Sequence, residues 1–259
     1  MKKVFGLLYI VYQFCIALPI LIAVTILASV VTIIGTLVGD SEFWGYYPGM
    51  IWARLMCIVL LIPVHKYGME NIQKGRTYII IPNHQSYFDI FMLFGFLGVN
   101  FKWIMKKELE RIPLVGAACR RCGYIFLDRS SVASSRKSIA KAEETLSKGI
   151  SIIIFPEGTR THDGSIGKFR KGAFAMALQT RQPLLPITIN GAFNVMSRHA
   201  WHVTWHPMSF TVHKPIETGG YNGEMAETGV DGLLRSLEEK ASEVIASDLI
   251  LPSSGVADR

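Results

Sequence analysis

The hydrophobic positions divide the chain into an apolar N-terminal section and a longer section of mixed pattern. Residues 5–38 are almost continuously apolar, with Gln13 as the one strongly polar side chain. As a single helix this run would be roughly 51 Å long, against a bilayer hydrocarbon core of about 30 Å. Either the run exceeds the membrane, or Pro19 and Gly35 divide it into a kinked or re-entrant arrangement.

A second apolar run covers residues 50–64 and is broken only by Arg54. It would reach roughly 22 Å as a helix, which is short for a membrane crossing. The pattern predicts N-terminal membrane-anchoring helices over residues 1–65. Whether they span the bilayer or lie within one leaflet stays open at this point.

From residue 66 onward, short β-rich runs alternate with helical segments. We expect strands near residues 77–81, 101–105, 124–127, 151–155, 184–189 and 205–212. Helices are expected near residues 90–97, 132–148, 172–179 and 230–245. This alternation is typical of the α/β class, with a mostly parallel or mixed sheet flanked by helices. We expect one α/β domain over residues 66–250 and a flexible tail over 251–259.

Composition and charge narrow the function classes. The chain has 259 residues, is 50% hydrophobic and carries a formal net charge of +7, with a mean hydropathy of +0.31, which excludes a disordered chain. Residues 66–180 hold 18 basic and 9 acidic side chains. This excess favours an anionic substrate or an anionic lipid surface, although a solvated basic face explains it equally well. We expect no nucleic-acid partner.

The cysteines and the N-terminal lysines bear on the compartment. Cys119 and Cys122 form a single C-x-x-C with no second pair, so we expect neither a zinc site nor a disulfide framework. A reducing, cytosolic environment is then the default. Lys2 and Lys3 before the apolar run favour an N-terminus that stays in the cytoplasm.

The first candidate site is the segment Asn-His-Gln-Ser-Tyr-Phe-Asp at residues 83–89, between an expected strand and an expected helix. Ligands of α/β sheets bind at such strand ends. The spacing allows the Asp89 carboxylate to fold back onto the His84 imidazole, fix its tautomer and leave one nitrogen free to accept a proton. The same spacing is also compatible with a hydrogen-bonded histidine of purely structural role.

The second candidate site follows the expected strand 151–155 and reads Pro-Glu-Gly-Thr-Arg over residues 156–160. The turn would deliver Glu157 and Arg160 to the same sheet edge as His84. A guanidinium at this position can hold a phosphate bidentately, and the Thr159 hydroxyl can add a donor. Lys106 and Arg129, each at the end of an expected strand, could add cations to the same rim.

Four ordered blocks carry a resemblance to a known family. They are Asn-His-x-x-x-x-Asp at 83–89, Gly-Tyr-Ile-Phe-Leu-Asp-Arg at 123–129, Phe-Pro-Glu-Gly-Thr-Arg at 155–160 and Leu-Pro-Ile-Thr-Ile-Asn at 185–190. The sequence resembles the glycerolipid acyltransferases over about residues 64–200, and among them the bacterial 1-acyl-sn-glycerol-3-phosphate acyltransferases. Ile187 stands where a valine is common, which is a mild departure.

The resemblance implies transfer of a fatty acyl group from acyl-CoA or acyl carrier protein to the 2-hydroxyl of lysophosphatidic acid, without a cofactor or metal. His84 would be the general base and Asp89 its partner. The acceptor site would comprise Lys106, Arg129, Glu157, Gly158, Thr159 and Arg160, where Thr159 rests on the turn argument rather than on the family. Lys106 matches a lysine of the family's Lys-x-Glu-Leu run.

The same resemblance favours a location at the cell inner membrane with the catalytic domain on the cytoplasmic face. Glycerol 3-phosphate or a lyso-aminolipid as acceptor remains an alternative within the same chemistry. A non-catalytic lipid-binding protein is an alternative from another class, although binding alone needs no base. A hydrolase is disfavoured because no Gly-x-Ser-x-Gly motif is present.

Overall fold

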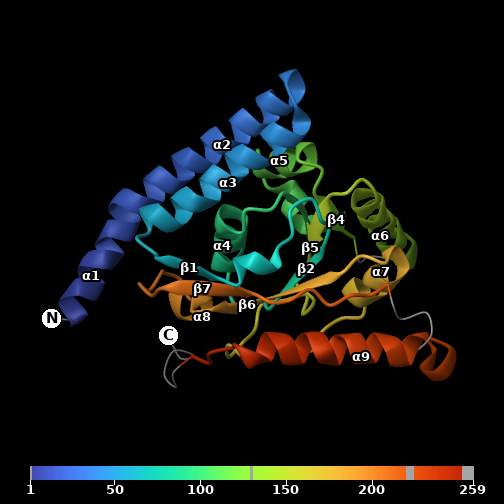
Figure 1. The fold of residues 1–259 in the computed structure, drawn as a ribbon. Coiled ribbons are helices and arrows are strands. Elements are labelled where there is room, and N and C mark those ends of the chain that lie inside the picture. The colour runs from blue at the N-terminus through green and yellow to red at the C-terminus, as the bar shows by residue number, and fades with distance from the viewer. Residues whose placement is uncertain (1, 129–130, 220–224, 253–259) are drawn as a thin grey trace.

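The computed structural model describes residues 2–128, 131–219 and 225–252 of the chain (Figure 1). Its first element is a continuous helical run made of α1 (Lys2–Tyr12), a π-helical segment η1 (Gln13–Ala17) and α2 (Leu18–Val38). The stretch Val4–Val38 is long and apolar enough to cross a membrane, by length and composition. The N-terminal apolar segment is thus helical, as expected.

Of the two arrangements considered for the first apolar run, the structure does not show the one divided at Pro19 and Gly35. Pro19 sits in the first turn of α2, and Gly35 lies inside that helix rather than dividing it. A Cβ at Gly35 would fall 2.4 Å from the Trp44 ring, so this glycine allows close packing of α3 (Ser41–Val59) on α2. The chain reverses at Asp40, whose carboxylate accepts a hydrogen bond from the Glu42 amide at 2.9 Å and caps α3.

Seven strands form one sheet in the order β1-β7-β6-β2-β5-β3-β4. Their bounds are β1 (Val64–Tyr67), β2 (Ile79–Pro82), β3 (Phe101–Lys106), β4 (Ile125–Leu127), β5 (Ser151–Ile153), β6 (Leu184–Asn190) and β7 (Met208–Val212). Every neighbouring pair is parallel except β6 and β7, which are antiparallel. The mixed sheet predicted from the sequence is confirmed.

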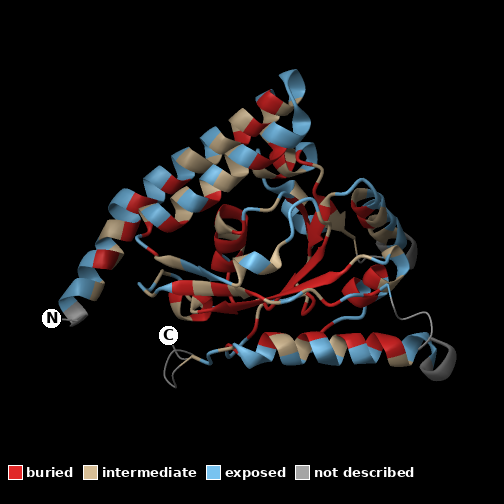
Figure 2. Cartoon of the chain, in the orientation of Figure 1, coloured by how far each residue is buried: buried red, intermediate tan, exposed pale blue. Residues whose placement is uncertain are grey.

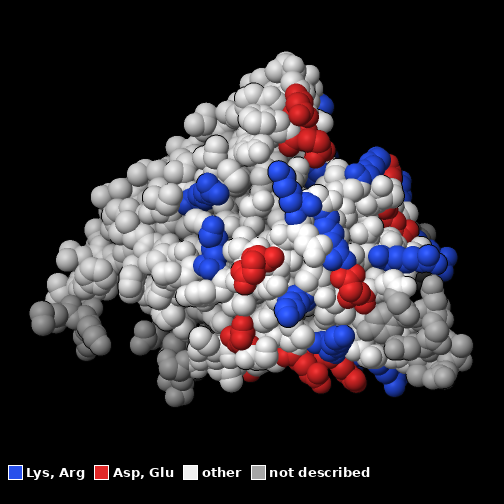
Figure 3. Space-filling model, viewed as in Figure 1, with Lys and Arg blue, Asp and Glu red and all other residues white. Residues whose placement is uncertain are grey.

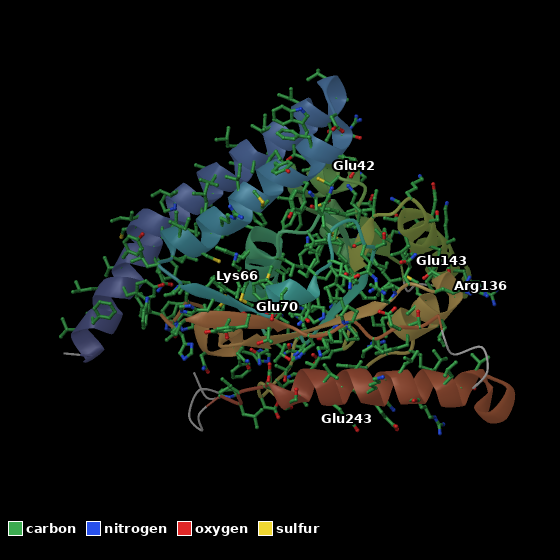
Figure 4. The ribbon with its side chains drawn as sticks, in the orientation of Figure 1. Glu42, Lys66, Glu70, Arg136, Glu143 and Glu243 are labelled. Atoms are coloured by element: carbon green, nitrogen blue, oxygen red, sulfur yellow. The ribbon has the colours of Figure 1, made fainter. Side chains whose placement is uncertain are left out.

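Helices cover both faces of the sheet (Figures 1 and 2). One core joins the sheet to α2, α3, α4 (Phe88–Phe96) and α5 (Val115–Arg121). The other joins its second face to α6 (Val132–Ser147), α7 (Gly172–Thr180) and α9 (Met225–Ser247). Figure 4 shows Glu243 on α9 pointing away from the sheet, on the exposed side of this amphipathic helix.

Several short elements were not anticipated from the pattern. They are β1, α5, α8 (Ala192–Val195) and the 3₁₀ turns η2 (Met69–Asn71) and η3 (Lys107–Arg111). The pattern places Val64 at the end of the preceding apolar run, because residues 64–67 show no alternation of apolar and polar side chains. Its parallel pairing with β7 is a long-range contact that local sequence does not encode. Residues 253–259 of the expected tail lie outside the described residues.

Candidate active site

The turn between β2 and α4 holds His84 and Asp89 together. The His84 Nδ1 and Asp89 Oδ2 atoms are 2.7 Å apart. The same carboxylate oxygen accepts hydrogen bonds from the backbone amides of Gln85 at 2.7 Å and Ser86 at 2.8 Å. Asp89 is fully buried in the first turn of α4, where a negative charge also complements the helix dipole. The carboxylate therefore fixes both the turn and the imidazole.

One further contact orients the His84 ring, and two hydrogen bonds of its neighbour Asn83 hold the start of the turn. Its plane stacks on the Phe155 ring, with centroids 3.8 Å apart and an interplanar angle of 14°. Below the turn, the Asn83 side chain exchanges two hydrogen bonds with the Ile189 backbone of β6. Because Nδ1 is engaged by Asp89, Nε2 is the nitrogen left for the adjoining cavity, which His84 lines. This is the arrangement of a general base with its orienting carboxylate.

Glu157 connects the His84 turn to the loop before α7. Its Oε1 accepts a hydrogen bond from the His84 amide at 2.7 Å, and its Oε2 accepts one from the Gly167 amide at 2.8 Å. A Cβ at residue 167 would fall 2.8 Å from Oε2, so a larger residue there would displace the Glu157 carboxylate. Burial raises the pKa of the Glu157 carboxyl to about 7, with the two amides lowering it and Asp89 raising it further.

We expect this raised pKa to appear as a pH dependence of stability. Between these two pKa values the folded protein keeps the Glu157 proton, whereas the unfolded chain releases it above its ordinary pKa of 4.5. The contribution of this proton to the free energy of unfolding is therefore fully present below pH 4.5 and is lost as pH rises through about 7. The loss is at most about 3 kcal/mol. Unfolding midpoints of the wild type and Glu157→Gln in one detergent, measured from pH 4.5 to 8, should show a flatter profile for the variant. If the unfolding midpoints of the two proteins changed with pH in the same way, this would contradict the raised pKa of Glu157.

Cationic side chains gather beside the His84 ring. The guanidinium carbon of Arg160 lies 3.8 Å from the Tyr87 ring centroid, and its buried Nη1 has no hydrogen-bond partner among the described residues. Lys106, at the end of β3, lines the same cavity, as do Gly158 and Thr159. Gly158 takes a φ of 72°, which the tight turn after β5 requires and which disfavours other residues.

Arg198, in the loop after α8, is a cavity-lining cation that sequence reasoning missed. Its Nη1 lies 3.3 Å from the Thr159 hydroxyl, 3.3 Å from the Arg160 carbonyl oxygen and 3.0 Å from His162 Nε2. It follows the last of the four sequence blocks and has no motif of its own. The only signal was a basic residue soon after a strand end, which is too common to select it.

These side chains stand at the polar end of a cavity of about 510 Å³, a size typical of ligand sites. The remaining walls are largely apolar and come from α2, α3, α4, β3 and α5. Representative residues are Ala28, Trp52, Phe94, Trp103 and Val115. The cavity thus joins a charged rim to an apolar interior that reaches the N-terminal helices.

The structure therefore gathers most of the predicted site. His84, Lys106, Gly158, Thr159 and Arg160 line one cavity, and Asp89 lies behind His84. Glu157 is not among the lining residues; its carboxylate bonds the two backbone amides described above. Arg129 lies outside the described residues. Among the described parts of the chain, no group of three or more His, Cys, Asp or Glu side chains is placed to hold a metal ion.

Comparison with known proteins agrees with this geometry. A family model described as acyltransferase matches residues 63–190. The crystal structure of the 1-acyl-sn-glycerophosphate (LPA) acyltransferase PlsC from Thermotoga maritima superposes with a TM-score of 0.75 and 27% identity, over 95% of this chain and 97% of that one. Residues 63–190 of the protein thus form an acyltransferase-family domain.

Two curated relatives carry the same name. A 1-acyl-sn-glycerol-3-phosphate acyltransferase of Saccharomyces cerevisiae is 29% identical over 234 residues, which are 88% of this chain and 77% of the yeast protein. A chloroplastic enzyme of the same name from Arabidopsis thaliana is 36% identical over 169 residues, covering 63% of this chain and 47% of the plant protein. The chain thus spans about half the length of this plant relative and of a similar one from Brassica napus, of which 49% is covered.

Proposed function

We propose that the protein transfers a fatty acyl group from an acyl thioester to the 2-hydroxyl of 1-acyl-sn-glycerol 3-phosphate and forms phosphatidic acid. The observation that carries this is the His84–Asp89 pair, joined at 2.7 Å, on the wall of a cavity whose rim also holds Lys106 and Arg160. The names of the relatives support the choice of acceptor.

In this mechanism His84 Nε2 accepts the proton of the acceptor hydroxyl as the oxygen attacks the thioester carbonyl. Asp89 stabilises the imidazolium that forms, and such base catalysis contributes about 10²- to 10⁴-fold. Collapse of the tetrahedral intermediate breaks the carbon–sulfur bond, and the thiolate leaves with the proton returned from His84. The acyl chains find apolar surroundings in the interior of the cavity.

Arg160 and Arg198 are the proposed ligands of the acceptor phosphate, with Lys106 as a third cation. A guanidinium offers paired N–H donors that match two phosphate oxygens. The partnerless Nη1 of Arg160, counted over the described residues, is a donor that an anion satisfies. Holding the phosphate also places the 2-hydroxyl beside His84, and positioning of this kind removes roughly 7 to 11 kcal/mol of barrier.

The partners follow from the same proposal. The acyl donor is acyl-CoA or acyl carrier protein, and the reaction needs no cofactor. The apolar helical run Val4–Val38 supports association with a membrane, where the lysolipid resides. We place the protein at the cell inner membrane with its catalytic domain on the cytoplasmic face.

The test of the function is thioester consumption by the purified full chain. We expect rapid release of thiol with lysophosphatidic acid and much less with glycerol 3-phosphate, lysophosphatidylcholine or no acceptor. The lipid product should be phosphatidic acid by mass. Release at the same rate without any acceptor would indicate a hydrolase, and no release with any acceptor would refute the proposal.

Arg160→Ala and Arg198→Ala should each raise the KM for lysophosphatidic acid by about tenfold or more, because each removes a charge-assisted contact to phosphate worth about 1.5 to 3 kcal/mol. Rates with a neutral monoacylglycerol, where measurable, should change little. Arg181→Ala, in an exposed αL position at the end of α7, is the matched control. An equal loss on charged and neutral acceptors would contradict the phosphate assignment.

A further inference from the structure

The loop of residues 197–207, between α8 and β7, exposes two tryptophans. Trp201 is 68% and Trp205 is 48% exposed. We call this segment the tryptophan loop. The proposed reaction uses neither indole, since the loop contributes only Arg198 to the cavity. Two large aromatic side chains left open on one short loop mark a contact surface rather than a core.

The tryptophan loop is fastened to the N-terminal helix. The Gln13 side chain donates a hydrogen bond from Nε2 to the Val203 backbone carbonyl at 2.7 Å, and its Oε1 accepts one from the Val203 backbone amide at 2.9 Å. The Phe14 and Trp201 rings stack with centroids 6.0 Å apart. These contacts give Gln13 a role: the one strongly polar side chain of the apolar run is buried by the loop it binds.

A third contact links the loop to the residues that follow α3. Trp205 Nε1 donates to the Leu61 carbonyl at 2.9 Å, just beyond α3. Gln13 and Phe14 both belong to the π-helical segment η1, and segments of this kind occur frequently at functional sites. The tryptophan loop therefore keeps a fixed position relative to α1, η1 and the end of α3.

The helix beside the loop presents a long apolar surface. Exposed large hydrophobic side chains recur along it: Val4, Phe5, Leu7, Leu8, Val11, Phe14, Ile16, Leu18, Ile20, Ile22, Ile26, Leu27, Ile34, Leu37 and Val38. In Figure 3 the described surface over α1 and the start of α2 shows no charged side chain, whereas Lys, Arg, Asp and Glu gather over the sheet and its other helices. A surface of this extent is a membrane-facing one.

We propose that the tryptophan loop is an interfacial anchor, whose Trp201 and Trp205 side chains bind the boundary between lipid headgroups and acyl chains. This rests on the membrane association in the proposed function and adds the site of contact. Indole rings favour this boundary because they combine a large apolar body with a polar N–H. Because Trp201 stacks on Phe14 of η1, the loop continues the apolar surface of the N-terminal helical run. We therefore take lipid, and not a protein, as the partner of the loop.

The anchor also has a consequence for the active site. Arg198 lies in the same loop as Trp201 and reaches the Thr159–Arg160 turn. A loop held at headgroup level therefore places the cationic rim of the cavity at the depth of the lysolipid phosphate. The N-terminal helix holds the protein to the bilayer, and the tryptophan loop sets the height and tilt of the catalytic domain.

The test is depth-dependent quenching of Trp201 in the full chain reconstituted into phosphatidylcholine–phosphatidylglycerol vesicles. Subtracting the emission of Trp201→Phe from that of the wild type isolates this indole. We expect strong quenching by lipids brominated near the glycerol backbone and weaker quenching by lipids brominated near the chain ends. Equal emission in brominated and unbrominated vesicles would overturn the proposal, and so would stronger quenching by the deep label.

A second measurement links the anchor to turnover. Trp201→Ser should lower turnover of vesicle-embedded lysolipid by about threefold or more and leave turnover in detergent micelles unchanged, with Trp201→Phe largely restoring it. Val230→Ser on α9, which removes a side chain 55% exposed on the opposite face of the sheet, is the matched control. Equal losses in vesicles and micelles would overturn the anchor. Absence of turnover in the wild type would refute the proposed function alone, since quenching needs no catalysis.

Discussion

His84→Ala is expected to lower kcat for acyl transfer by about 10²- to 10⁴-fold. The variant removes the nitrogen that accepts the acceptor's proton and leaves the Arg160 side of the cavity in place. Binding of lysophosphatidic acid should therefore be retained within about threefold, since the base contributes mainly in the transition state. The measurement is single-turnover thioester consumption together with equilibrium binding of the lysolipid.

Two controls make this result specific to the base. The His84 ring stacks on Phe155, so thermal unfolding must show that the variant is folded. His162→Ala removes another imidazole near the rim, which contacts Arg198 and lies outside the proposed proton path. Turnover by His84→Ala at the wild-type rate would reject the general-base assignment and with it the proposed mechanism.

Asp89→Asn should lower kcat by about 10²-fold or more while changing KM little. The asparagine oxygen can still accept from His84 Nδ1 and the backbone amides of the turn, so the geometry is nearly kept. What is lost is the negative charge that stabilises the imidazolium. The new amide group would also occupy the place of Oδ1, which is buried with no partner among the described residues.

The readouts that separate this charge effect from misfolding are the KM for lysophosphatidic acid and the thermal unfolding midpoint of the variant. A lost charge should lower kcat and leave the KM for lysophosphatidic acid and the thermal unfolding midpoint near their wild-type values, whereas a misfolded variant would change all three. Asp163→Asn, in an exposed turn bonded to Ser165, is the matched carboxylate control. Wild-type kcat in Asp89→Asn would show that the pair at 2.7 Å is structural only.

Both predictions concern a site whose residues could be identified from the sequence, whereas their arrangement in space depends on how the strands pair. The blocks at 83–89 and 155–160 follow strands β2 and β5, and the parallel pairing of these strands brings both turns to one edge. The segment pattern sufficed for this because a buried strand, a turn and a helix each have local signatures. The His84–Asp89 contact is likewise short in sequence, since a five-residue turn closes it.

Three features required long-range packing and so escaped the pattern. The Glu157 carboxylate accepts hydrogen bonds from the backbone amides of His84 and Gly167, and no local spacing predicts these contacts. Arg198 reaches the cavity only because α8 and the tryptophan loop fold back over the turn of Thr159. Strand β1 forms because β7, far along the chain, pairs with it.

The amino-acid sequence by itself determined the α/β class, the apolar N-terminal helix and the identity of the proposed base and its carboxylate, because periodicity, turn chemistry and short motifs are local properties. Only the tertiary structure decided how the parts meet: the Gly35–Trp44 packing of α2 on α3, the Gln13 contact with the tryptophan loop, and the cavity that these helices complete. Such contacts join residues distant in the chain, and their energies depend on shape complementarity that exists only after the sheet and helices have packed.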